Sequence, residues 1–233
     1  MALNLNLMMI LCFALTLTAA TLGNAIQYVV YNNALSTLGG CRFDQEIGVE
    51  YVQQTLILAT DFIDALFGLN NNVAAVNKVT ITVENIDGVA FATSDNIIHV
   101  SAGYIERYPG RDIKADITGV IYHEIVHILL SNGNNTVQPP SGLVEGMADF
   151  VRLRAGYVAD SWAPVGVGFK WDQGYEVTAY FLDYCESIRV GFVADLYKLI
   201  MQNGYNESYF QGLLGMPVSQ LWTNYKAFHD LTN

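Results

Sequence analysis

Basic side chains are scarce in this chain of 233 residues, which has 11 lysines and arginines against 22 aspartates and glutamates. The formal net charge is -11 when the histidines are neutral. A surface of this sign repels the phosphates of nucleic acids and the anionic headgroups of membranes. The composition therefore argues against nucleic-acid binding and against association with membranes.

Charge is absent altogether from the first 25 residues, which contain no Asp, Glu, Lys or Arg. An apolar run from Leu7 to Ala20 leads to Gly23-Asn24-Ala25, which has the small-x-small pattern of a cleavage site. An uncleaved membrane anchor is the weaker alternative, because the run is short for a membrane span. We therefore predict a signal peptide over 1–25 and a secreted, extracellular chain that begins at Ile26.

Cysteine is rare too, and Cys12 is removed together with the predicted signal peptide. Cys41 and Cys185 remain, and two thiols in an oxidising compartment can pair if their α carbons come within about 7 Å. The sequence leaves this disulfide open. Two short sequons, at Asn134 and Asn206, predict N-glycosylation in polar, loop-like stretches.

No repeats or low-complexity tracts divide the chain, and 52% of its residues are hydrophobic, so we predict a single domain over 26–233. Alternating polar and apolar residues predict strands over 28–31, 78–84, 89–93 and 97–100. Helical spacing predicts a long helix over 44–67, another from Asp112 to about Leu130, and further helices over 176–188, 192–201 and 218–228. This order predicts an α+β fold, in which a lobe with a small mixed sheet over 26–131 precedes a mostly helical lobe over 132–233.

The motif His123-Glu124-Ile125-Val126-His127 carries most of the functional information. On a helix, residues four apart lie nearly one above the other, so His123 and His127 project from one face and can bind one metal ion. Glu124 lies beside them, where it can take a proton from a water molecule at the metal without being a ligand. The spacing predicts a catalytic zinc site. The alternative is a helix that buries these side chains among core partners.

A catalytic zinc needs a third protein ligand, and Glu145 in the segment Glu145-Gly146-Met147-Ala148-Asp149 is the predicted one. Asp149, one helical turn later, is predicted to accept a hydrogen bond from the other ring nitrogen of a ligand histidine. The alternatives are a solvated helix carboxylate for Glu145 and a surface pair with Arg152 for Asp149.

Hydrolysis of a peptide bond also needs a hydrogen-bond donor for the developing oxyanion. Tyr175 is the predicted donor, because the glycine before it allows close approach of the backbone. Tyr180 and His229 are weaker candidates, and His99 in a predicted strand is a candidate for the substrate-binding edge. For each of them a packed, structural role is the alternative.

The chain resembles the basic secretory proteins of plants and bacteria over nearly all of its length after residue 25, and five segments carry this resemblance. They are Asn33–Thr37, His123–His127, Gly142–Arg152, Trp171–Tyr175 and Phe181–Cys185. The resemblance implies a zincin-like metallopeptidase that depends on Zn²⁺ and is secreted to the plant apoplast, or an allied bacterial setting, in defence or stress. It also supports Glu145 as a metal ligand and Asp149 as the residue that orients a ligand histidine.

The sequence departs from that family in two respects. Its net charge of -11 does not fit the word basic in the family name, and it argues against partners selected by positive charge. After His127 the aliphatic run Ile128-Leu129-Leu130 replaces aromatic and amide residues of relatives, which changes the predicted pocket wall and leaves the ligand set intact.

We therefore predict a secreted zinc peptidase that acts on peptide or protein substrates. Endopeptidase and exopeptidase action both stay open, because no motif that would capture a substrate amine is visible. The alternative is a non-catalytic defence or cell-wall binding protein that keeps the zincin scaffold. An intact Glu124 argues against it, because a structural metal site has no use for a general base. Trp162 and Trp171 are candidates for the walls of the cleft, with a place in the core as the alternative for each.

Overall fold

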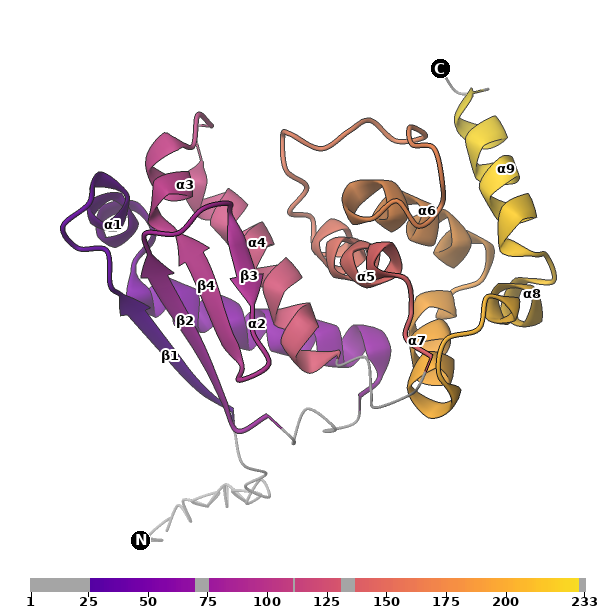
Figure 1. Cartoon of the computed structure of the whole chain (residues 1–233), viewed down its shortest axis with the longest axis horizontal. Coiled ribbons are helices and arrows are strands. Elements are labelled where there is room, and N and C mark those ends of the chain that lie inside the picture. Colours follow the sequence, from indigo (N-terminus) through magenta and orange to yellow (C-terminus); the bar gives the residue numbers. More distant parts are fainter. Residues whose placement is uncertain (1–25, 70–75, 111, 131–136, 231–233) are drawn as a thin grey trace, which may run out of the picture.

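The computed structural model describes residues 26–69, 76–110, 112–130 and 137–230. The predicted signal peptide over 1–25 and the sequon at Asn134 lie outside these ranges. In Figure 1 a sheet with its helices forms one half of the molecule and a group of helices forms the other, with helix α4 (Ile113–Leu129) between them. The predicted α+β class is confirmed.

Four strands form the sheet within the described residues, in the order β1-β2-β4-β3. Their bounds are β1 Gln27–Asn32, β2 Lys78–Glu84, β3 Ala90–Ala92 and β4 Ile97–Ser101. Strands β1, β2 and β4 are parallel, whereas β3 is antiparallel to β4, so the sheet is mixed as predicted. Strand β3 forms one edge of this sheet, next to α4.

Helices cover one face of the sheet. Val79, Ile81 and Val83 alternate along β2 and are buried in one core with side chains of α2 (Val49–Phe67) and α4. Figure 1 shows α2 passing behind the strands. The opposite face carries His99, which stacks on Phe91 across the β3–β4 pair. The covered face therefore provides the packed support on which α4 lies.

The predicted helix over 44–67 is interrupted at Gly48, so this prediction is wrong at its N-terminal end. Gly48 has a φ of 86°, which glycine adopts without the steric cost of a Cβ. Before it, α1 (Leu38–Arg42) and a π-helical turn (Phe43–Ile47) form a separate segment. The structure also adds α3 (Ala102–Arg107), which the apolar spacing does not predict.

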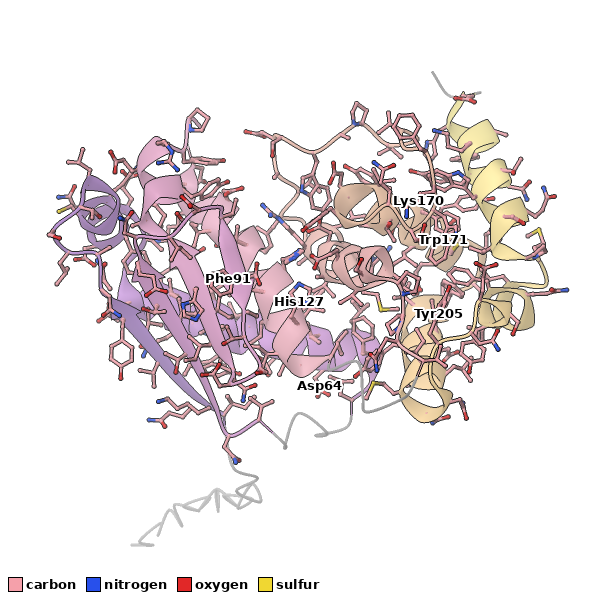
Figure 2. The ribbon with its side chains drawn as sticks, viewed as in Figure 1. Asp64, Phe91, His127, Lys170, Trp171 and Tyr205 are labelled. Atoms are coloured by element: carbon pink, nitrogen blue, oxygen red, sulfur yellow. The ribbon has the colours of Figure 1, made fainter. Side chains whose placement is uncertain are left out.

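The second half of the molecule consists of α5 Ser141–Arg154, α6 Tyr175–Ile188, α7 Phe192–Asn203, α8 Ser208–Leu214 and α9 Val218–Asp230. Its core is aromatic: the ring of Phe181 contacts those of Trp171, Phe210 and Tyr225. Trp171 therefore belongs to this core (Figure 2), and its predicted place in the cleft wall is wrong. None of the helices in the described ranges has the length and apolar character needed to cross a bilayer.

The structure does not pair Cys41 with Cys185, because both cysteines are free. Cys41 is exposed in α1, beside the sheet, whereas Cys185 is buried in α6 in the other half of the molecule (Figure 1). Burial raises the pKa of the Cys185 thiol well above its usual range. The two thiols should consequently differ in reactivity.

We expect iodoacetamide to modify Cys41 but not Cys185 in the native protein, since a buried thiol with a raised pKa forms little thiolate. Peptide mass spectrometry after a short exposure at neutral pH measures the label on each cysteine. The same reaction in concentrated urea is the control, in which both cysteines should be labelled. A disulfide-linked peptide that contains Cys41 and Cys185 would contradict the structure.

Candidate metal centre

Two packed helices, α4 and α5, supply the charged side chains of the candidate site. Asp112 caps the start of α4, where its carboxylate accepts a hydrogen bond from the N–H of Ala115 at 2.8 Å. Helix α4 is buried along nearly its whole length, as its apolar sequence predicts. It holds His123 buried and His127 half-buried, while Glu145 approaches both from α5.

The three predicted ligand atoms converge on one point. The Nε2 atoms of His123 and His127 are 3.2 Å apart. One carboxylate oxygen of Glu145 lies 3.2 Å from Nε2 of His123 and 3.6 Å from Nε2 of His127. Bonds of about 2.1 Å to a tetrahedral ion would separate its donor atoms by about 3.4 Å. These three side chains therefore have the spacing of one face of a zinc-sized tetrahedron, and they could hold a metal ion.

Asp149 contacts the ring nitrogen of His123 that faces away from Glu145. Its Oδ1 accepts a hydrogen bond from Nδ1 of His123 at 2.7 Å, which turns Nε2 of that ring toward Glu145. Asp149 is only 3% exposed, so water competes little for this bond. The alternative of a surface pair between Asp149 and Arg152 is wrong, because Arg152 is buried and pairs with Asp116 at 3.0 Å.

The surroundings of these ligands favour positive charge. Burial lowers the pKa of His123, but hydrogen bonds to Asp149 and Glu145 outweigh burial and raise the pKa to about 9. Burial raises the pKa of Glu145, yet its hydrogen bonds with His123 and His127 dominate and lower the pKa to about 2. The two carboxylates thus stabilise a cation at this point, whether it is a proton or a metal ion.

Glu124 follows His123 on α4 and lies against the edge strand. Burial raises the pKa of Glu124, and the charges of His123 and His127 only partly oppose the rise. The backbone of Ala92 in β3 contributes a hydrogen bond to the carboxylate. A carboxylate with a raised pKa can accept and release a proton nearer to neutral pH than an exposed one.

Tyr175 is the first residue of α6, and its ring is parallel to the ring of His123 with centroids 6.1 Å apart. Gly142 in α5 lets the backbone just before Tyr175 pack closely on that helix, because a Cβ there would lie 1.9 Å from the carbonyl oxygen of Asp172. The negative charge of Glu145 is the main cause of a raised pKa for Tyr175. The Tyr175 hydroxyl therefore stays protonated at neutral pH and can donate a hydrogen bond.

A cavity of about 610 Å³ opens over these groups. Strand β3 forms one wall with Phe91, α4 and α5 form the floor, and Trp162, Tyr175 and Glu176 form the opposite wall. Phe91 and His127 are labelled in Figure 2, on the edge strand and on α4. The cavity thus joins the candidate metal ligands, Glu124 and Tyr175 in one space that a substrate can enter.

Three weaker candidates lie outside the cavity wall. Tyr180 packs edge-on against Trp162, His99 forms a hydrogen bond with Glu84 on the face of the sheet opposite α2, and His229 contacts the ring of Tyr225. These contacts fit the structural alternatives for the three residues. Asn206 is exposed just before α8, so its glycosylation stays a prediction on an accessible side chain.

Two charged residues of the wall, Arg152 and Glu176, were not predicted to line the site. Glu176 directly follows Tyr175, so the same turn that places the tyrosine also places this carboxylate. Arg152 is seven residues after Glu145 in the sequence, and this spacing puts both side chains on one face of a helix. The spacing from Glu145 could therefore have predicted that Arg152 lines the site.

A family model described as "Peptidase of plants and bacteria" matches residues 23–225, a range that includes every residue of the cavity wall. The chain belongs to the basic secretory protein family. It is similar to a relative in this family, the "Basic secretory protease" of Boswellia serrata, with 41% identity over 58 residues. These residues are 25% of this chain and 64% of the relative, so the chain spans just under two thirds of that protein's length. No solved structure matches the chain.

In this member of the basic secretory protein family, Asp149 is expected to strengthen metal binding through His123. We expect Asp149→Ala to weaken zinc affinity by about 10- to 100-fold, the usual loss when a hydrogen-bond partner of a ligand histidine is removed. Competition with a chromophoric chelator measures the affinity. Asp183→Ala is the matched control, because Asp183 pairs with Arg154 at the surface. Unchanged affinity in Asp149→Ala would show that His123 needs no such support.

Proposed function

We propose that the protein is a secreted, zinc-dependent peptidase of the zincin type that hydrolyses peptide bonds. The observation that carries the proposal is the convergence of donor atoms from His123, His127 and Glu145 at separations of 3.2 to 3.6 Å, beside Glu124. Zinc held by these ligands would polarise the scissile carbonyl and lower the pKa of a water molecule. The description of the family as peptidases supports this function.

In this proposal Glu124 acts as the general base. It is buried beside the two histidines, where it can take a proton from the attacking water and pass it to the leaving amine. Tyr175 lines the cavity, and its ring is parallel to that of His123. From there its hydroxyl can donate a hydrogen bond to the oxyanion that develops on the carbonyl. Together these two side chains supply the base and the donor that hydrolysis requires.

The edge strand supports a peptide as the substrate. Strand β3 pairs with β4 along one side only in the sheet described above, and its residues line the cavity. An extended peptide can add to such an edge by main-chain hydrogen bonds. A peptide bound in this way would run between β3 and the wall formed by Tyr175 and Trp162, with its backbone over Glu124.

A non-catalytic binding protein with a structural metal fits these features less well. Structural zinc sites are closed by four protein ligands, whereas the cluster in the described residues has three and opens into the cavity. We propose secretion because of the predicted signal peptide, and the relative named a secretory protease supports it. We propose action in the plant apoplast during defence or stress because of the family resemblance.

We expect Glu124→Gln to lower kcat/KM for peptide hydrolysis by about 10²- to 10⁴-fold, because the amide cannot act as a base. Fluorogenic peptide libraries measure cleavage, and elemental analysis should show that the variant still binds zinc. Glu106→Gln, at an exposed carboxylate of α3, is the matched control. A chelator should abolish wild-type activity and added zinc should restore it. Zinc binding by the wild type without cleavage of any peptide would favour the non-catalytic alternative.

Tyr175→Phe removes the proposed oxyanion donor and keeps the ring that stacks on His123. We expect kcat to fall by about 10²- to 10³-fold with little change in KM, since the hydrogen bond forms mainly in the transition state. Steady-state kinetics on one good peptide substrate separate the two constants. Tyr31→Phe, on the exposed end of β1, serves as the control. A loss confined to KM would assign Tyr175 to substrate binding.

A further inference from the structure

Among the described residues that line the cavity, Arg152 is the one arginine or lysine. The other ionisable groups of the wall are the two histidines, Tyr175 and four carboxylates, those of Glu124, Glu145, Asp149 and Glu176. Arg152 is 8% exposed and still contributes to the cavity surface. Neither the metal ligation nor the proton transfers proposed above use this side chain.

The guanidinium of Arg152 is held rigidly from behind. Its Nε donates to the carbonyl oxygen of Tyr157 at 2.8 Å, and its Nη2 donates to Asp116 at 3.0 Å. Asp116 in turn accepts a hydrogen bond from the hydroxyl of Tyr104 at 2.7 Å. A guanidinium has five N–H groups, so these two contacts leave three of them for a ligand. Because the group is already fixed in place, binding such a ligand costs little side-chain entropy.

Trp162 covers the guanidinium and helps to form the same end of the cavity. The centroid of its ring lies 5.7 Å from the central carbon of the Arg152 guanidinium. Val120, one helical turn before His123 on α4, adds an apolar surface there. Hydrogen bonds between a guanidinium and a carboxylate are stronger where apolar groups exclude water.

The distance from the metal ligands suits a peptide. Arg152 follows Glu145 by seven residues on α5, which corresponds to about 10 Å along the helix axis. An extended chain advances about 3.3 Å per residue, so this end of the cavity lies within reach of substrate residues one to three positions from the scissile bond. A carboxylate can come from an aspartate or glutamate side chain at such a position or from the C-terminus of a short peptide.

We propose that Arg152 binds a substrate carboxylate at this end of the cavity and gives the enzyme a preference for peptides that carry one close to the scissile bond. This inference rests on the proposed peptidase function and adds the substrate class to it. The planar guanidinium presents paired N–H groups that match a carboxylate, and Trp162 keeps them from bulk water.

Matched peptides test the preference in the zinc-loaded, full-length protein. One series carries Glu, Gln or Lys at each of the three positions on either side of the scissile bond, and a second series has a free or an amidated C-terminus. We expect kcat/KM to be at least about tenfold higher for Glu than for Gln at one position, or for the free acid than for the amide. The series that responds identifies the source of the carboxylate. Equal rates throughout, or a preference for Lys, would overturn the proposal.

Variants assign the preference to Arg152. Loss of Arg152 alone would leave Asp116 buried without its positively charged partner, so the test uses the double variant Arg152→Met with Asp116→Asn. We expect its ratio of rates for Glu over Gln to fall to about one, and this ratio is insensitive to a general loss of folded enzyme. Asp116→Asn alone keeps the guanidinium and should keep the preference. A ratio unchanged in the double variant would show that Arg152 does not bind the substrate.

If no peptide is cleaved, the peptidase function fails, and the carboxylate site is then tested by binding. Fluorescence polarisation of labelled Glu and Gln peptides with the zinc-loaded protein gives the ratio of their binding affinities, which replaces the ratio of cleavage rates. Tighter binding of the carboxylate peptide that disappears in the double variant would support the site. Equal binding of both peptides would overturn it.

Discussion

The site depends on the packing of α5 against α4 through three buried or half-buried polar contacts. Along this interface Glu145 meets the two histidines, Asp149 meets His123, and Arg152 meets Asp116. Each contact satisfies groups that would be costly to bury alone. A slip of one residue would turn a helix by about 100° and break all three contacts together, so the polar pairs fix the register that brings the candidate ligands to one point.

The parts of the site that the sequence predicts are those set by local helix geometry. His123 and His127 are one turn apart on a single helix, and Asp149 is one turn after Glu145, so their grouping needs no knowledge of the tertiary structure. The helix over Ile113–Leu129 and the strands also follow from local patterns of capping and alternation. The distances then show that the two local groups face each other.

Features that depend on contacts between distant segments were missed or mistaken. Arg152 resembles a surface residue in the sequence, because its partner Asp116 is 36 positions away on another helix. Trp171 is part of an aromatic core built from helices that follow it in the chain. The pairing of Cys41 and Cys185 could not be judged either, since it depends on how the two halves of the molecule are arranged. Gly48 interrupts a helix whose apolar spacing continues on both sides.

The shortness of β3 also limits how far its free edge can pair with another chain. Long exposed sheet edges promote association with neighbouring molecules and aggregation, and natural proteins limit this danger by keeping edge strands brief. Strand β3 extends only over Ala90–Ala92. An edge of this length can form few backbone hydrogen bonds with a misfolded neighbour, and it can pair with only a few residues of any bound chain. In the proposed peptidase, discrimination between substrate sequences would therefore come from the side chains around the cavity rather than from backbone pairing.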